Sequence, residues 1–477
     1  MFRVQRQSAG QQNSSVAAVK SGVWFTVCHM LTKTVGFLTT PIFARILTKA
    51  EFGDYNNFHT WIGIFLYVTS LNLDASLIRA KYDYKDELDD YISSMVCLSM
   101  ISTVTWYGVT LLLISTVEKL TLMSQFEIHA MFLYLLFYPA IQIFQTRERY
   151  HYRYKTNVFV TLLYVIGTAL LSVILVMLMQ NKLTGRIIGT IIPVAIIGFV
   201  LAFLVFRKSF SIKTKYWKYA LPFTLPFIPH LLSMFLLGSM DKVMIKQICG
   251  SEDLAKYSLA YTVGTIISLL VSSMNNAFSP WLSEQLNGGQ FDKSKKVSVP
   301  YVAFFALAAV MGVLITPEVL LIIGGEGYLE AKHVVPQVFA GCVMQFVYCM
   351  YVNVEQFYKK TVGMAIASVS SALFNFVTNY IFIRQYGYNA ASYTTFFSYL
   401  LLMILHVFIV KKLMKMNVFK DLYVILIAGV TAALLIASNL IIDMFIVRYI
   451  LFAVLFVIFM CIAYKNRQIA LKFLKRK

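Results

Sequence analysis

The sequence predicts an all-α protein that crosses a membrane many times. Hydrophobic residues make up 59% of its 477 residues and charged residues only 13%, whereas an average soluble protein carries roughly 25% charged residues. The mean hydropathy is +0.70. The apolar residues gather in long uninterrupted runs. These runs are too long and too uniformly apolar for the strands of a membrane barrel, so helices are the spanning elements that fit.

About fourteen runs reach the length of about 20 residues that a spanning helix needs. We predict spans over residues 20–46, 53–78, 89–117, 127–146, 156–180, 186–206, 219–248, 255–283, 297–323, 333–357, 362–384, 388–410, 420–442 and 445–464. The first run is too long for a signal-peptide core and lacks a cleavage pattern, so we expect it to stay in the protein. Connections such as 207–218 and 284–296 are too short to hold a catalytic domain.

Two related turns indicate that the chain is duplicated. When Glu51 is aligned with Asp253, Tyr55 falls on Tyr257 and Thr60 on Thr262. Many transporters are built from two copies of one helix bundle. We therefore expect four parts, which are a tail over residues 1–19, an N-terminal lobe of spans 1–6 over 20–215, a C-terminal lobe of spans 7–12 over 216–415, and spans 13–14 with a basic tail over 416–477.

The net charge of +20 reflects topology rather than nucleic-acid binding. The chain has 42 Lys and Arg against 22 Asp and Glu, and most of the basic residues fall in every second loop. Cytoplasmic loops of membrane proteins carry such an excess. The pattern places both termini in the cytoplasm and leaves no soluble domain for nucleic acid. The six cysteines show no metal-ligand spacing, so we expect no metal site.

Ionisable residues within the first spans are candidates for function, because each costs about 2.5 to 3.5 kcal/mol to insert. His29 and Lys33 lie one turn apart on one face of the first span. Lys33, near mid-depth, either forms a salt bridge with a neighbour such as Asp74 or faces a cavity and binds an anion. Arg45 ends this span, where it either meets the interface or joins that anion site. His29 is a packing residue or a coupling residue.

The seventh span combines a broken start with an ionisable pair. Pro222, Pro226 and Pro229 cannot leave a regular helix, because each removes a hydrogen-bond donor. Asp241 and Lys242 follow, as an ion pair between helices or as a titratable or cation-coordinating group in a transport cycle coupled to H⁺ or Na⁺. We expect Glu355, near the cytoplasmic end of the tenth span, to snorkel toward the interface.

The basic, aromatic segment 147–155 lies at the predicted cytoplasmic mouth. Arg147 and Arg149 either fix the topology and anchor lipid headgroups, or meet a phosphate-bearing lipid as it enters. The sequence contains no catalytic triad, HExxH motif or P-loop, so we expect neither an enzyme nor a bound cofactor.

Four segments carry a resemblance to a known family. They are Pro41–Leu47 with Glu51–Tyr55, Ser239–Lys242 with Ala255–Tyr257, Gly325–Ala331 with Val334–Pro336, and Asn375 and Asn379 with Tyr386–Ala391. In order and spacing they resemble the Wzx-type oligosaccharide flippases of the polysaccharide transporter family, within the multidrug/oligosaccharidyl-lipid/polysaccharide (MOP) exporter superfamily. Ala255 replaces the usual Gly of the second turn, and Lys242 stands where Arg is commoner.

The resemblance implies a substrate, undecaprenyl-diphosphate-linked oligosaccharide, that crosses the bacterial cytoplasmic (inner) membrane for O-antigen, capsule or exopolysaccharide synthesis. Two six-helix lobes would alternate access to a cavity, with a polysaccharide polymerase and a chain-length regulator as partners. Lys33, Arg45, Arg147 and Arg149 would offer cations to the anionic head. A cation or drug antiporter of the same superfamily stays open as an alternative. A membrane-embedded polymerase or ligase is another, although the short outer turns argue against it.

Overall fold

The computed structural model describes residue 32 and residues 34–151 and 153–465. All regular elements within those ranges are helices, which confirms the predicted all-α membrane fold. Ten described helices are long and apolar enough to cross a membrane, or twelve if each of two bent pairs counts as one span. Two shorter apolar helices, Thr34–Ile46 and Phe445–Cys461, lie where we predicted the first and last spans. The total of fourteen stays a prediction.

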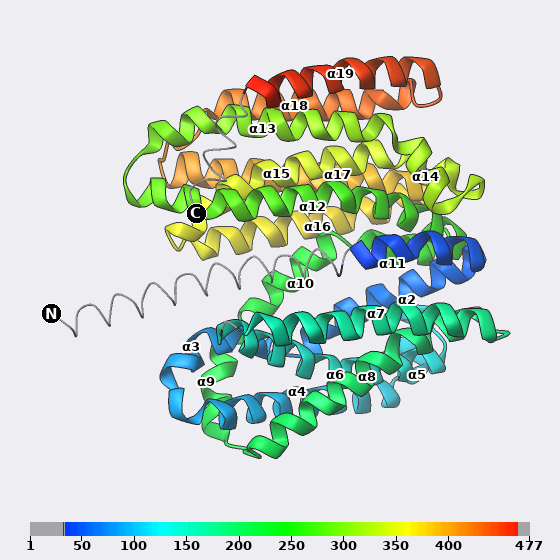
Figure 1. Cartoon of the computed structure of the whole chain (residues 1–477), viewed down its shortest axis with the longest axis vertical. Coiled ribbons are helices and arrows are strands. Elements are labelled where there is room, and N and C mark those ends of the chain that lie inside the picture. The colour runs from blue at the N-terminus through cyan, green and yellow to red at the C-terminus, as the bar shows by residue number, and fades with distance from the viewer. Residues whose placement is uncertain (1–31, 33, 152, 466–477) are drawn as a thin grey trace. The chain divides into compact units, whose positions relative to one another are not determined.

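The chain divides into two compact units, residues 1–247 and 248–477 (Figure 1). The N-terminal unit begins with helix Thr34–Ile46. It continues with α2 (Lys49–Thr69), η1 (Leu73–Ser76), α3 (Leu77–Asp83), η2 (Lys85–Glu87), α4 (Leu88–Leu112), α5 (Ile114–Thr121), α6 (Gln125–Tyr150), α7 (Tyr154–Leu178), α8 (Lys182–Lys208), α9 (Thr214–Thr224), α10 (Phe227–Leu237) and α11 (Met240–Ile248). Helices α9 and α10 pack on η1, α4 and α2, so the segment as far as Gln247 groups with this unit.

Two of the spans in the N-terminal unit are broken. Helices α9 and α10 meet at a bend of 49°, beside Pro226, which confirms that the prolines interrupt the seventh span. Helix α2 meets the η1–α3 segment at a bend of 45°. No proline causes this second bend. At this bend Leu71 and Asn72 have positive φ, a conformation that Asn tolerates better than most residues.

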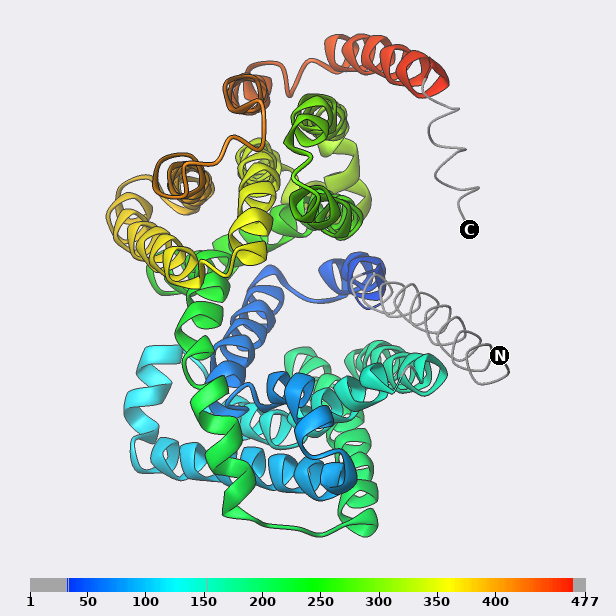
Figure 2. The same cartoon turned by 90° about the vertical axis from the view of Figure 1, so that its left-hand side faces the viewer.

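The C-terminal unit is built around one central helix, α15. Its elements are α12 (Ser251–Asn287), α13 (Phe291–Leu314), α14 (Thr316–Gly324), η3 (Glu326–His333), α15 (Val335–Phe357), α16 (Thr361–Tyr386), α17 (Tyr388–Phe408), η4 (Ile409–Leu413), α18 (Asp421–Ala437), η5 (Ser438–Leu440) and α19 (Phe445–Lys465). Helix α15 packs against α12, α13, α17 and α18, and Figure 2 shows it in yellow between green α13 and orange α17 and α18.

The burial of α15 overturns one prediction from the sequence. Glu355 was expected to snorkel to the interface, but its side chain is fully buried and pairs with His406 of α17. The reason is that neighbouring helices surround α15. Glu355 lies near the end of its helix, but these neighbours keep its side chain from water.

The order of helices supports the internal repeat. A long helix, a short helix and three long helices occur as α4 to α8 and again as α13 to α17. Helix α2 begins after Thr48 and α12 begins after Gly250, which are matching positions in the alignment of the two turns. The caps differ, because Thr48 and Glu51 form a capping box, whereas Gly250 has φ 94°.

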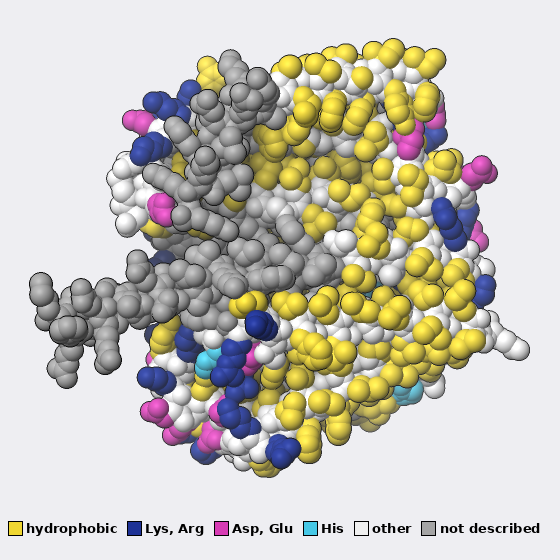
Figure 3. All heavy atoms as spheres, viewed as in Figure 1, with side chains coloured by type: hydrophobic (Ala, Val, Ile, Leu, Met, Phe, Trp, Pro, Cys, Tyr) yellow, Lys and Arg dark blue, Asp and Glu magenta, His cyan; other side chains and the backbone are white. Residues whose placement is uncertain are grey.

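The surface of the N-terminal unit has the pattern of a membrane protein. In Figure 3 charged side chains gather at one end, beside α3 and α9, and apolar side chains cover the length of α7. Phe159, Leu170 and Met177 of α7 are all more than half exposed. Soluble monomers rarely expose apolar patches of this extent. These faces are therefore suited to contact with lipid.

Candidate functional site

Two of the predicted site residues cannot be placed, and a third lies at a helix end. His29 and Lys33 lie outside the described residues, so the cavity-facing role of Lys33 stays a prediction. Arg45 is exposed in the last turn of helix Thr34–Ile46. Beside it, Lys182 at the start of α8 donates a hydrogen bond to the carbonyl oxygen of Ile46 at 3.0 Å. This end of the unit is therefore basic.

Arg147 and Arg149 lie at the opposite end of the N-terminal unit. Arg147 forms a salt bridge with Asp89 at 2.9 Å, and Lys208 at the end of α8 binds the same carboxylate at 2.7 Å. Helix α8 has 27 residues, and about 1.5 Å per residue separates its two ends by about 40 Å. Arg45 and Arg147 therefore belong to two separate basic regions.

Asp74 lies at the bend after α2 and faces α6. The Thr146 hydroxyl donates to its carboxylate at 3.5 Å, and the charge of the exposed Arg149 acts on it. Both neighbours come from the last turns of α6. Among the described residues Asp74 thus has a cationic neighbour other than the predicted Lys33.

Asp241 and Lys242 occupy the first turn of α11. Asp241 is fully buried, and its carboxylate accepts a hydrogen bond from the backbone N–H of Lys242 at 2.8 Å. A carboxylate is favourable at a helix start, because the N-terminal end of the helix dipole is positive. This contact has a structural role, because it stabilises the start of α11. Whether the pair also takes part in coupling stays a prediction.

Arg186 of α8 is a buried cation that the sequence did not single out. Only 9% of it is exposed, and its guanidinium lies 3.4 Å from the ring centroid of Phe43 and 3.8 Å from that of Tyr55. Each cation–π contact of a desolvated arginine contributes about 2 kcal/mol. Its Nε and Nη1 groups find no hydrogen-bond partner among the described residues. Both N–H groups could therefore be used by an anionic oxygen.

A histidine and a second cation lie near Arg186. His59 of α2 is exposed and lies within electrostatic range of Arg186 and Lys242. We call Arg186 and Lys242 the cationic cluster, which draws on α8 and α11, and His59 of α2 lies within range of both. Tyr55, beside Arg186, is fixed by a hydrogen bond between its hydroxyl and that of Thr190 at 3.0 Å. Arginine stacked on fixed rings is suited to phosphate or carboxylate recognition.

The signal for this cluster in the sequence is weak. Arg186 stands at the predicted start of the sixth span, where a basic residue is ordinary. Helix α8 instead begins at Lys182, which places Arg186 one turn inside the helix. The contact with Phe43 and Tyr55 joins distant parts of the chain, and no local pattern predicts it.

The basic end near α9 is largely neutralised by its own carboxylates. Lys213 binds Asp90 at 2.6 Å, which raises the pKa of the Lys213 ammonium. Glu87 accepts hydrogen bonds from Lys215 and Tyr216. Partial burial, followed by the charges of Arg147 and Arg153, lowers the pKa of His151. These pairs connect loops and helix ends, so their role is structural.

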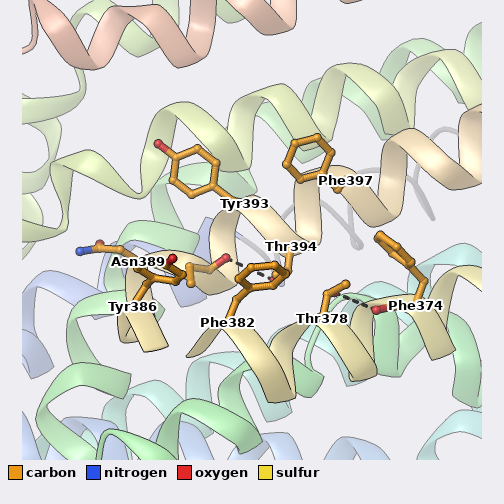
Figure 4. A pocket seen from close by; sticks show the side chains of 9 residues that line it. Phe374, Thr378, Phe382, Tyr386, Asn389, Tyr393, Thr394 and Phe397 are labelled. Carbon is orange, nitrogen blue, oxygen red and sulfur yellow. Dashed lines mark hydrogen bonds between the residues drawn. The ribbon is translucent and has the colours of Figure 1, made fainter. Parts of the chain in front are cut away.

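A cavity of about 500 Å³ lies between α16 and α17 of the C-terminal unit (Figure 4). Its walls are mostly aromatic, and they include Phe374, Phe382, Tyr386, Tyr393 and Phe397. Such a lining suits a hydrocarbon rather than a sugar or an ion. Across the described ranges, no three His, Cys, Asp or Glu side chains are grouped so that they could hold a metal ion.

Comparison with known families identifies the type of protein. Residues 18–286 match the family described as "Polysaccharide biosynthesis protein". The chain belongs to this family. A second match, over residues 226–381, is to the MatE family. The predicted resemblance to Wzx-type flippases of the MOP superfamily is thereby confirmed. This family member is a multi-pass membrane transporter and not an enzyme, which removes the polymerase or ligase alternative.

Relatives of the family member occur in Haemophilus influenzae. "Lsg locus putative protein 1" is 24% identical over 378 residues, which cover 74% of this chain and 88% of the relative. An "Uncharacterized membrane protein" is 20% identical over 381 residues, which cover 75% of this chain and 88% of the relative. The alignments thus extend over most of each chain.

Solved structures share the fold of this family member. "Lipid II flippase MurJ, inward closed conformation" aligns with a TM-score of 0.67 and 13% identity, over 94% of this chain and 100% of that one. An inward-facing "multidrug resistance MATE family transporter of the MOP superfamily" aligns with a TM-score of 0.61 and 14% identity, over 84% of this chain and 95% of that one. At such identities the likeness establishes the fold alone.

Proposed function

We propose that this flippase moves undecaprenyl-diphosphate-linked oligosaccharides from the cytoplasmic to the outer leaflet of the bacterial cytoplasmic membrane, for O-antigen, capsule or exopolysaccharide synthesis. The observation that carries the proposal is the cationic cluster of the N-terminal unit. Its buried member, Arg186, forms no salt bridge with a carboxylate among the described residues. Cations held together in this way favour the binding of an anion.

The chemistry of the substrate matches this cluster. A diphosphate is strongly anionic, and arginine binds phosphate oxygens through charge-assisted hydrogen bonds. Arg186 has two N–H groups available, and the aromatic rings of Phe43 and Tyr55 hold its guanidinium in place. The lipid tail can stay in the bilayer while the head crosses. Only the head then needs a polar path.

We propose that the two basic regions act in sequence. Arg147 and Arg149 would meet the head at the cytoplasmic end, and Arg45 would lie at the other end of α8, with both termini in the cytoplasm. Lys33 would face the cavity between them. Alternating access would open the path to each side in turn, coupled to an ion gradient. A polysaccharide polymerase and a chain-length regulator would be the partners that consume the product.

Flipping by purified protein in proteoliposomes tests the proposal. The readout is the fraction of undecaprenyl-diphosphate-linked oligosaccharide that becomes accessible to a membrane-impermeant lectin. We expect Arg186→Met to slow flipping at least tenfold, because a lost charged hydrogen bond costs about 1.5 to 3 kcal/mol. Lys85→Met removes one exposed positive charge elsewhere and is the matched control. Equal rates for wild type and Arg186→Met would refute the role of the cluster.

The same assay tests the residues that the sequence singled out. We expect Lys33→Ala and Arg45→Ala, in everted vesicles, to flip the native lipid-linked oligosaccharide more slowly than wild type. Flipping at the wild-type rate by both variants would contradict a cationic path through the N-terminal lobe.

The match of residues 226–381 to the MatE family favours a second candidate, an antiporter of small cations or drugs. A cavity for cations is expected to present carboxylates, whereas the cluster here is cationic. Ethidium transport by the same proteoliposomes separates the two. We expect no ethidium transport, and ethidium transport without lipid flipping would establish the antiporter instead.

A further inference from the structure

The C-terminal unit contains a buried acid–imidazole pair. Glu355 of α15 and His406 of α17 have side chains that are 0% and 2% exposed, and His406 Nδ1 lies 2.6 Å from Glu355 Oε1. The other carboxylate oxygen, Oε2, has no hydrogen-bond partner among the described residues. Burying a carboxylate that is only half satisfied is costly. Structural packing alone gives no reason to keep such a group in a membrane-spanning helix.

The surroundings of the pair are apolar and closely packed. The ring of Tyr348 stacks on the imidazole of His406, with centroids 5.7 Å apart. Gly363 of α16 faces the carboxylate, and a Cβ added there would lie 3.8 Å from Oε2 and 3.3 Å from Ile409. The charge state of the pair is therefore set mainly by the pair itself, because little water or protein polarity reaches it.

The C-terminal unit holds a second buried carboxylate, which has partners of its own. Asp421 of α18 accepts a hydrogen bond from Tyr351 at 2.8 Å and lies 3.5 Å from the Lys411 ammonium. Helix α12 contributes the uncharged Asn275, which binds Asn353 of α15. The remaining groups are Cys349 of α15, Tyr301 of α13, Tyr399 of α17, Lys359 and Lys360 in the turn before α16, and Lys412 of η4. Among the described residues, no salt bridge joins any of these lysines to the carboxylate of Glu355.

We infer that the Glu355–His406 pair is a reversible proton-binding site that couples the transport cycle to H⁺. The inference rests on the proposed flippase function and adds the coupling ion and its site. With a proton bound, the pair is an ionised carboxylate and an imidazolium, and is neutral overall. Without it, the imidazole is neutral and the pair carries one buried negative charge. Release of the proton is therefore unfavourable until water reaches the site.

A proton fits this site better than a metal cation. Hard cations take several oxygen ligands, whereas the pair offers one free carboxylate oxygen and an imidazole nitrogen. The neighbouring Gly363 and Ile409 add no oxygen-bearing side chain. Loading and release of H⁺ need only the proton shared between Nδ1 and Oε1.

The local backbone offers a route for opening. Directly after α17 the chain forms a π-helical turn, η4, within one turn of His406. Such turns are weak points in a helix and often mark functional sites. On the other side, the backbone N–H of Lys360 donates to the carbonyl oxygen of Glu355 at 2.9 Å and closes the end of α15. Loosening of these two ends would admit water to the pair.

A titration of the purified full-length protein in lipid nanodiscs tests the proton site without any substrate. The readouts are the infrared carboxyl band and the imidazole nitrogen resonances of His406 as the pH is varied. We expect wild type to show a coupled titration of one carboxyl and one imidazole. Glu355→Gln should remove it, and Asp421→Asn, which alters a second buried carboxylate of the C-terminal unit, should leave it in place. A titration that persists in Glu355→Gln, or none in wild type, overturns the inference.

A transport arm separates failure of this inference from failure of the proposed function. In proteoliposomes carrying undecaprenyl-diphosphate-linked oligosaccharide, we expect a pH gradient to accelerate flipping by wild type and by Asp421→Asn. Glu355→Gln and His406→Gln should lose the acceleration. Flipping that responds to the gradient in all variants overturns the coupling role. If wild type does not flip this lipid, the proposed function fails, and the titration alone decides the proton site.

Discussion

At the scale of single residues, charges in this protein are distinguished by their partners rather than by their depth in the membrane. Arg186 is buried between two aromatic rings with open N–H groups. Arg448 is also buried, but its two terminal nitrogens are engaged, because they bind both carboxylate oxygens of Glu318 at 2.9 and 2.7 Å. The first arrangement is suited to binding a ligand, and the second ties α19 to α14.

The Arg448–Glu318 contact predicts a loss of stability on mutation. We expect Arg448→Ala to lower the free energy of unfolding by about 3 kcal/mol, since removing one partner of a largely buried ion pair leaves the other uncompensated. Thermal unfolding in detergent, followed by fluorescence, measures the change. The double variant Arg448→Met with Glu318→Leu should recover part of the loss. An unchanged melting temperature in Arg448→Ala would contradict a bridging role.

The same contact predicts a dependence on pH. The hydrogen bonds from Arg448 lower the pKa of the Glu318 carboxyl below its ordinary value. A carboxyl with a lowered pKa stabilises the folded state above its unfolded pKa, and this contribution is lost as the pH falls through the folded pKa. We therefore expect wild type to be more stable than Glu318→Gln at neutral pH and the difference to shrink in acid. A difference in stability that grows toward acid pH would contradict a lowered pKa for Glu318.

At the scale of elements, two matching helix starts use different chemistry. The Thr48 hydroxyl accepts from the backbone N–H of Glu51 at 3.2 Å, and the Glu51 carboxylate accepts from the backbone N–H of Thr48 at 2.8 Å. At the start of α12, Gly250 has φ 94° and offers no side chain that could cap the helix. The first start depends on side-chain hydrogen bonds, and the second depends on the freedom of glycine.

These two starts predict different sensitivities. We expect Thr48→Ala to cost about 1 kcal/mol of stability and Thr48→Ser to cost little, because Ser caps equally well. Gly250→Ala should also cost about 1 kcal/mol, here through backbone strain at positive φ. Thermal unfolding of the three variants checks both expectations. Equal stability of Thr48→Ala and Thr48→Ser would remove the capping explanation.

At the scale of the whole molecule, the distribution of Lys and Arg predicts the orientation in the membrane. Lys293, in the first turn of α13, is expected on the cytoplasmic side, and Glu326, at the start of η3, on the outer side. Both side chains are exposed. In a variant whose six cysteines are replaced by serine, a membrane-impermeant maleimide should label Glu326→Cys in spheroplasts and Lys293→Cys only after lysis. The reverse labelling would invert the topology.

The class of the protein could be predicted from the sequence alone, because apolar run length and charge composition are local properties. The helical fold, the break at Pro226 and the family resemblance all followed from patterns within short segments. Contacts between distant segments did not. Glu355 and His406 are 51 residues apart in the chain, and Arg186 meets rings from two other helices. These sites could be found only in the folded protein, since burial and pairing depend on which helices pack together rather than on where a residue lies along its own helix.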